Sequence, residues 1–104
     1  MFPTLLIVDD ERATREGLRS ALDEEFEVYT ASSNSEALAI LKSEAIQLLL
    51  TDLRLGGDSG MDLIDTASKL PEPPVILMMT AYVSVDTAVE AMRRGAFHFV
   101  TKPL

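Results

Sequence analysis

Short hydrophobic runs alternate with amphipathic segments along the whole chain. Five runs have the length of β-strands and are mostly rich in Val, Ile, Leu or Phe: Leu5–Val8, Phe26–Ala31, Ile46–Thr51, Val75–Met79 and Phe97–Thr101. Near-continuous apolar runs of this kind are typical of strands buried on both faces of a parallel sheet. The pattern therefore predicts five buried strands joined by longer connections.

The connections between the runs carry helical patterns. The clearest spans Val85–Met92, with apolar residues at i, i+3, i+4 and i+7, and ends in two arginines and Gly95. A capping box, Ser33–Glu36, opens a second helix. The other two helices are expected over about 11–24 and 60–70. The element order is β-α-β-α-β-α-β-α-β.

Strict alternation of strands and helices restricts the topology. Connections this short require parallel strands with right-handed crossovers, so helices cover both faces of the sheet. We therefore predict an α/β, doubly wound parallel sheet of five strands, with the strand order 2-1-3-4-5. Ligands of such sheets bind at the carboxyl ends of the strands, where the strand order reverses. Function is expected at that edge.

Composition and charge narrow the function classes. A chain of 104 residues forms one domain, and 17 Asp and Glu against nine Lys and Arg give a net charge of −8. This charge repels nucleic-acid backbones and anionic membranes, so neither is an expected direct partner. With no Cys and one His, the chain cannot build a disulfide framework or a Cys/His zinc site, and any metal must be oxygen-bound. The apolar runs are too short to span a membrane and no signal peptide is recognisable, which predicts a cytoplasmic protein.

Polar side chains follow four of the predicted strands. Asp9 and Asp10 follow the first, Asp52 the third, Thr80 the fourth and Lys102 the fifth. Two carboxylates about 5 Å apart repel by roughly 3 kcal/mol at an effective dielectric near 20, so three together need a counter-charge. Mg²⁺ suits carboxylates that share a site with a phosphate, while a lysine and a hydroxyl suit phosphoryl oxygens. The edge is therefore predicted to support phosphoryl chemistry on a carboxylate.

Each of these residues also has an ordinary structural interpretation. Asp9 and Asp10 could cap a helix, Asp52 could belong to a turn, and Thr80 and Lys102 could simply end strands. The functional interpretation rests on their meeting at one edge of one sheet. His98, between two phenylalanines, is interpreted as a half-exposed strand residue with no catalytic role.

As a set, these motifs resemble the receiver domains of two-component response regulators. The resemblance covers essentially the whole chain, through Leu6–Glu11, Thr51–Leu53, Met79–Ala81 and Thr101–Pro103. The segment Thr80–Phe97 further resembles the nitrogen-regulator (NtrC-like) class, whose members drive enhancer-dependent transcription through an ATPase domain. The resemblance implies a flavodoxin-like sheet and a module that catalyses only its own phosphorylation and dephosphorylation.

The resemblance also implies roles for particular residues. Asp52 would be the phosphoacceptor, taking a phosphoryl group from a sensor histidine kinase. Asp10 and Asp52 would ligate Mg²⁺ directly, together with the main-chain carbonyl of Arg54, and Asp9 would act through a bound water.

The resemblance assigns the phosphoryl contacts and the switch as well. Thr80 and Lys102 would bind oxygens of the phosphoryl group. Phe99 would be a switch aromatic that rotates inward as Thr80 moves, relaying the change to an output domain or partner that is absent from this chain, with transcription regulation as the outcome.

Two other functions compete with the signalling switch. A Mg²⁺-dependent phosphatase or phosphotransferase with an aspartyl nucleophile also uses a carboxylate trio, but it needs Asp-x-Asp after the first strand, where Asp9–Glu11 stands. A flavin or nucleotide binder on this fold needs a Gly- or Ser/Thr-rich loop there. Both are less consistent with the sequence.

The resemblance also raises an expectation about the domain boundary. The receiver domain is expected to occupy residues 1–104 and to end before the fifth helix that the family usually has. Without that helix, one face of the sheet would lose several hundred Å² of cover, more than a monomer usually leaves bare. The expectation is that this chain is part of a longer one or associates through that face, for example as a homodimer.

Overall fold

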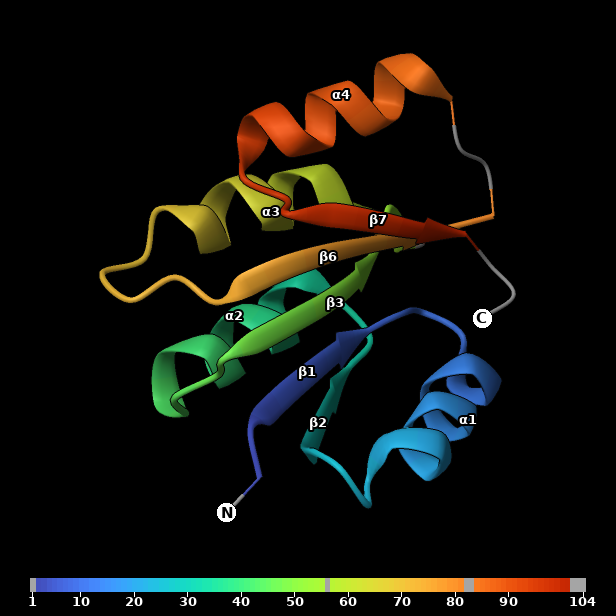
Figure 1. Cartoon of the computed structure of the whole chain (residues 1–104), viewed down its shortest axis with the longest axis vertical. Coiled ribbons are helices and arrows are strands. Elements are labelled where there is room, and N and C mark those ends of the chain that lie inside the picture. Colours follow the sequence, from blue (N-terminus) through green and yellow to red (C-terminus); the bar gives the residue numbers. More distant parts are fainter. Residues whose placement is uncertain (1, 56, 82–83, 102–104) are drawn as a thin grey trace.

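In the part of the chain that the structure describes, five strands form one sheet with four helices around it (Figure 1). The computed structural model describes residues 2–55, 57–81 and 84–101. The sheet strands are β1 (Thr4–Val8), β2 (Glu27–Ala31), β3 (Leu48–Asp52), β6 (Val75–Thr80) and β7 (His98–Thr101). The helices are α1 (Arg12–Leu22), α2 (Asn34–Ser43), α3 (Gly60–Ser68) and α4 (Val85–Arg94). Two further short strands, β4 (Arg54–Leu55) and β5 (Asp58–Ser59), follow β3.

The sheet has the predicted topology. Its order is β2-β1-β3-β6-β7, and each neighbouring pair is parallel, which is the 2-1-3-4-5 order of the five long strands. In the register, Val8 of β1 pairs with Thr51 of β3, and Asp52 pairs with Met79 of β6. The carboxyl ends of β1, β3 and β6 therefore lie side by side at one edge of the sheet. The doubly wound, flavodoxin-like prediction is confirmed.

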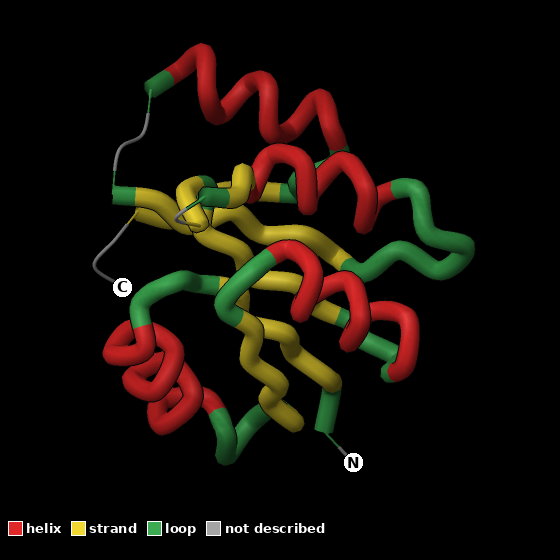
Figure 2. The backbone as a smooth tube through the Cα atoms, turned by 180° about the vertical axis from the view of Figure 1, so that it is seen from behind, coloured by secondary structure: helices red, strands yellow, loops and turns green. Residues whose placement is uncertain are grey.

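Helices cover the sheet unequally on its two faces. The larger hydrophobic cluster lies between the sheet and α2, α3 and α4, and includes Leu6, Leu49 and Ile64. The smaller cluster holds Leu5, Ile7, Leu50 and Met79, with partly buried residues of α1, β2, β6 and β7 packed against it. Figure 2 shows α1 set apart from the other three helices. Of the described helices, α1 therefore lies on one face and α2, α3 and α4 on the other, which agrees with the prediction that helices cover both faces.

The start of α2 departs slightly from the expected capping box. The Ser33 hydroxyl accepts a hydrogen bond from the Glu36 N–H at 3.3 Å, as predicted. The Glu36 carboxylate, however, accepts from the Ser32 N–H at 3.0 Å and from the Ser32 hydroxyl, one residue before the cap. The hydrogen bond from the Ser32 side chain, and to a smaller extent the one from its backbone N–H, holds the pKa of Glu36 below its ordinary value.

The apolar stripe of α4 correctly predicts the helix but not its buried face. Val85, Val89 and Met92 of the stripe are exposed, whereas Ala88 is buried. Small residues are needed on the inner face because α4 ends very close to α3. At the positive-φ end of α4, a side chain on Gly95 would bring its Cβ to 2.5 Å from the Ser68 Cβ.

The hairpin between β3 and α3 was not predicted. None of the five predicted strands covers this stretch, yet Arg54 pairs with Ser59 and Leu55 with Asp58 in an antiparallel ladder. Leu55 is buried in the larger cluster, which ties the hairpin to the core. Within the described residues, no helix is long and apolar enough to cross a membrane.

Candidate functional site

Three carboxylates meet at the carboxyl edge of the sheet. Asp9 and Asp10 directly follow β1, and Asp52 is the last residue of the neighbouring strand β3. One oxygen from each side chain lies within 4.8 Å of the others. Asp9 is fully buried and Asp52 is 8% exposed, whereas Asp10 is open to solvent. The two strand ends thus form an acidic pocket with a buried floor and an open side, as the sequence predicts.

Backbone N–H groups orient the two buried carboxylates in the same way. Asp9 Oδ1 accepts from the N–H of Glu11 at 2.8 Å, and Asp52 Oδ1 accepts from the N–H of Arg54 at 3.2 Å. Each acid therefore bonds the residue two positions later, the local turn that aspartate favours. The hydroxyl of Thr51, also buried, donates to the Asp52 carbonyl at 2.9 Å. These contacts fix the carboxylates in the pocket through short, local interactions.

Arg15 is a contributor that sequence reasoning missed. Its guanidinium Nη1 donates to the main-chain carbonyl of Asp9 at 2.8 Å, so a positive group of α1 lies against the first turn of the pocket. Arg15 also lowers the pKa of Glu36 through its charge, as a smaller contribution. Arg15 stands in the first turns of the helix that follows Asp9 and Asp10, and this position is the signal that could have revealed its contact.

Gly60 is a second missed residue, and it packs directly against the pocket. Its N–H donates to the Leu53 carbonyl at 2.8 Å. A Cβ built on Gly60 would stand 2.0 Å from the carbonyl oxygen of Asp52, which no side chain tolerates. The absence of a side chain is therefore what lets α3 begin immediately beside Asp52. The available signal was a glycine at the start of the helix expected over about 60–70.

The structure describes three of the four remaining predicted residues, which are Thr80, Arg54 and Phe99. Thr80 ends β6 and is 2% exposed, one position beyond the residue that pairs with Asp52. Arg54 opens the hairpin, with an exposed side chain. Phe99 is the second residue of β7 and is half-buried against the larger cluster. Lys102 lies outside the described residues.

His98 behaves as expected for a strand residue. It is exposed, its Nδ1 accepts from the Phe99 N–H at 2.9 Å, and its ring meets the Phe99 ring edge-on at 5.6 Å. These local contacts give it no place in the acidic pocket.

The donor set of the pocket fits a hard divalent cation. Carboxylate oxygens are the ligands that Mg²⁺ and Ca²⁺ prefer, and the like charges of Asp9, Asp10 and Asp52 favour a bound cation between them. Because Asp10 is exposed, water can reach this side of the pocket. The arrangement can therefore hold a metal next to a nearly buried carboxylate.

The described part of the chain is a five-stranded doubly wound sheet with three carboxylates gathered at the carboxyl edge, where β1 and β3 end. The sequence matches the response regulator receiver domain family over residues 5–104. The chain belongs to this family. Its relatives are response regulators of the nitrogen-regulator (NtrC-like) class, many of them transcriptional, as the sequence resemblance implied.

One curated relative illustrates the similarity. The response regulator protein PilR of Pseudomonas aeruginosa is 44% identical over 101 residues, which is 95% of this chain and 22% of the relative. The chain therefore spans about a fifth of the length of the curated relatives that it matches.

Solved structures agree with the fold. A Burkholderia pseudomallei response regulator, described with a phosphorylated aspartic acid, a calcium ion and citrate, is 33% identical with a TM-score of 0.93 and covers 98% of this chain and 61% of that one. NtrX from Brucella abortus, in complex with ADP, is 34% identical with a TM-score of 0.90 and covers 100% of this chain and 24% of that one. Of the three functions considered from sequence, family membership favours the receiver domain.

Proposed function

We propose that this domain is a phosphorylatable switch in which Asp52 accepts a phosphoryl group from a sensor histidine kinase. The observation that carries the proposal is the convergence of Asp9, Asp10 and Asp52 within 4.8 Å at the edge where doubly wound sheets bind their ligands. Asp52 is the one of the three that ends a strand, and hydrogen bonds hold both its main-chain carbonyl and its carboxylate. A carboxylate held in place in this way is a competent nucleophile.

Mg²⁺ is the proposed cofactor. Asp10, Asp52 and the main-chain carbonyl of Arg54 would hold it directly, with Asp9 acting through a bound water. When bound, the ion neutralises negative charge on the carboxylates and on the incoming phosphoryl oxygens. Three acidic groups at this spacing support the assignment because they repel one another without a cation.

The reaction itself needs few parts from the protein. An Asp52 carboxylate oxygen attacks the phosphorus of the phosphohistidine, the new P–O bond forms as the P–N bond breaks, and the histidine nitrogen leaves with the bonding electrons and is protonated. The product is an acyl phosphate on Asp52. Thr80 and Lys102 are proposed to bind its oxygens, and Thr80 with Phe99 to relay the change to an output domain, with transcription regulation as the proposed outcome.

The test is phosphorylation by a small donor. The purified domain with Mg²⁺ and acetyl phosphate should gain the mass of one phosphoryl group, acid-stable and base-labile, and should gain none in EDTA. Asp52→Asn should abolish the gain, while Asp23→Asn, with the same charge change at an exposed position at the end of α1, should not. Equal labelling of Asp52→Asn would refute the assignment.

A second pair of variants separates metal binding from phosphoryl binding. Asp10→Ala should weaken Mg²⁺ binding and slow phosphorylation together, because Asp10 is proposed to ligate the ion. Lys102→Ala should slow phosphorylation but leave Mg²⁺ affinity unchanged. An Asp10→Ala protein with unaltered Mg²⁺ affinity would contradict this division of roles.

A further inference from the structure

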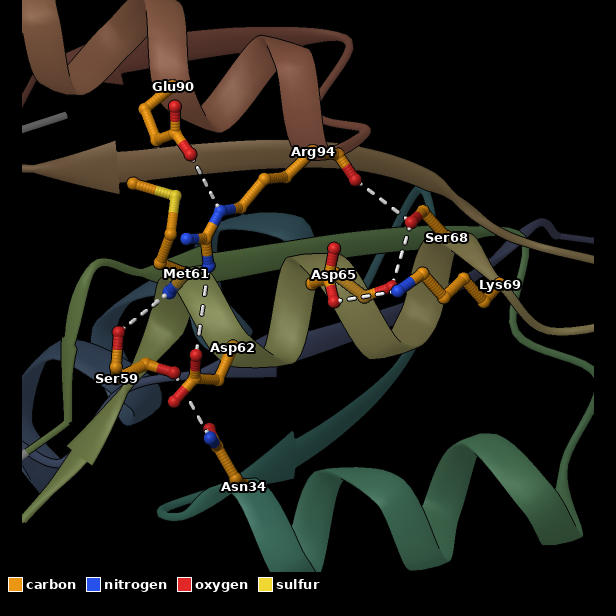
Figure 3. A network of polar contacts seen from close by, with 9 residues as sticks. All are labelled: Asn34, Ser59, Met61, Asp62, Asp65, Ser68, Lys69, Glu90 and Arg94. Atoms are coloured by element: carbon orange, nitrogen blue, oxygen red, sulfur yellow. Dashed lines mark hydrogen bonds and ion pairs between the residues drawn. The ribbon is translucent and has the colours of Figure 1, made fainter.

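A pair of hydrogen bonds joins the start of α2 to the hairpin that follows Asp52. The Asn34 main-chain N–H donates to Asp58 Oδ2 at 2.9 Å, and the Asn34 side-chain Nδ2 donates to the Ser59 carbonyl at 3.0 Å. The partners are 24 and 25 residues apart in sequence. In Figure 3, Asn34 reaches from α2 toward Ser59 at the start of α3. We call these two bonds the Asn34 clasp.

The clasp acts on the strand opposite Arg54. Ser59 pairs with Arg54 in the hairpin, and Asp58 pairs with Leu55. The hydroxyl of Ser59 also accepts from the Met61 N–H at 3.2 Å and so caps α3. Ser59 is therefore held at its carbonyl by α2 and at its side chain by α3, which leaves little freedom for the backbone of Arg54 across the ladder.

The other end of the hairpin is anchored at the pocket itself. Gly60, directly after Ser59, donates its N–H to Leu53 at 2.8 Å and touches the Asp52 carbonyl. Leu53 and Gly60 thus meet beside Asp52, at the base of the β4–β5 hairpin. The Asn34 clasp is the contact that ties the outer part of this hairpin to a separate helix.

We infer that Asn34 and Asp58 are positioning residues for the metal pocket: the clasp holds the hairpin so that the main-chain carbonyl of Arg54 and the carboxylate of Asp52 face the same cation. The inference rests on the proposed function, because it takes Arg54 and Asp52 as the ligands. Neither Asn34 nor Asp58 belongs to the acidic trio, so each acts through the backbone that it holds.

Substitution of Asn34 can distinguish a role in positioning the metal pocket from a contribution to the stability of the fold. Its Oδ1 is buried with no hydrogen-bond partner among the described residues, which is unfavourable for folding. Asn34→Ala therefore removes one hydrogen bond and one uncompensated buried acceptor together. We expect its melting temperature to stay near that of the wild type while its Mg²⁺ affinity falls.

The experiment measures Mg²⁺ affinity by calorimetric titration, amide hydrogen exchange at Arg54 and Gly60, and the rate of phosphorylation by acetyl phosphate. Asn34→Ala and Asp58→Ala should each weaken Mg²⁺ binding about two- to tenfold, the range expected for one hydrogen bond, and should speed exchange at both amides. Asp58→Asn should stay within about twofold of the wild type, because the amide oxygen that it introduces still accepts from the Asn34 N–H.

A matched control removes the same charge elsewhere. Asp65 lies on α3 and forms an exposed i,i+4 pair with Lys69 at 3.0 Å. Asp65→Ala should leave Mg²⁺ affinity unchanged if geometry and not net charge sets the affinity. Loss of affinity in Asp65→Ala or Asp58→Asn equal to that in Asp58→Ala would overturn the inference in favour of simple electrostatics.

The outcomes distinguish this inference from the proposed function. Wild-type protein that binds Mg²⁺ and is phosphorylated, together with unchanged affinity and exchange in Asn34→Ala and Asp58→Ala, would overturn the clasp alone. Wild-type protein that neither binds Mg²⁺ nor accepts a phosphoryl group would overturn both.

Discussion

Neutralising Asp10 should stabilise the protein without metal and remove its stabilisation by Mg²⁺. The three pocket carboxylates lie within 4.8 Å of one another. Two charges at that distance repel by about 3 kcal/mol at an effective dielectric near 20 and by about 1 kcal/mol in bulk water. Because Asp10 is exposed, we expect the lower part of this range, about 1–2 kcal/mol, for Asp10→Asn.

The assay is thermal unfolding followed by circular dichroism, in EDTA and in excess Mg²⁺. For a domain of this size, 1 kcal/mol corresponds to about 5 °C, so Asp10→Asn should melt roughly 5–10 °C above the wild type in EDTA. The effect should persist at physiological salt, where the Debye length of about 8 Å exceeds the separation of the carboxylates. In Mg²⁺ at about 100 times its dissociation constant, the wild type should gain about 2.7 kcal/mol and the variant much less.

Glu24→Gln is the matched control, since it removes one negative charge at an exposed position beyond α1. It should leave both the melting temperature in EDTA and the response to Mg²⁺ nearly unchanged. An Asp10→Asn protein that melts below the wild type in EDTA would refute the repulsion argument. One that is stabilised by Mg²⁺ as fully as the wild type would refute the place of Asp10 in the metal site.

Two further predictions follow from close contacts elsewhere. Gly60→Ala should destabilise the protein by on the order of 3 kcal/mol in urea unfolding and should impair phosphorylation, because the new Cβ would overlap the Asp52 carbonyl. Gly17→Ala, which has open space around it in α1, should instead stabilise the protein by about 1 kcal/mol. Equal effects of the two substitutions on the free energy of unfolding would contradict this account. Hydrogen bonds to Glu44 and then Glu27 raise the pKa of Tyr29 to about 12. The stability that Tyr29 contributes is thus fully present below its unfolded pKa near 10 and is lost as pH rises through 12. Glu44→Gln should lower the midpoint of the Tyr29 titration followed by NMR. An unchanged midpoint would contradict this explanation.

The sheet and its functional edge could be predicted because their signals are local. Apolar runs of four to six residues identify the strands, alternation with helices fixes parallel pairing, and the edge then follows from topology. Asp9, Asp10 and Asp52 were placed together on this basis, and the structure brings them within 4.8 Å. The positions of Thr80 and Phe99 follow from the same register, while their proposed roles remain predictions.

The features that escaped prediction depend on contacts between distant segments. β4 and β5 have two residues each, too few for any periodicity, and Asn34 contacts Asp58 across 24 residues of sequence. The apolar stripe of α4 includes both Ala88 and Val89, and only Ala88 of these two is buried, because the close approach of α4 to α3 favours the smaller side chain. Such distances are set by packing, which a single sequence does not display.

The most direct test of the central claim locates the phosphoryl group on the chain. After reaction with acetyl phosphate and Mg²⁺, borohydride reduces an acyl phosphate of aspartate to homoserine, and tandem mass spectrometry of the peptides identifies the residue. The account predicts homoserine at position 52, dependent on Mg²⁺ and absent when the donor is omitted. Homoserine at Asp9 or Asp10 with Asp52 unmodified would contradict it.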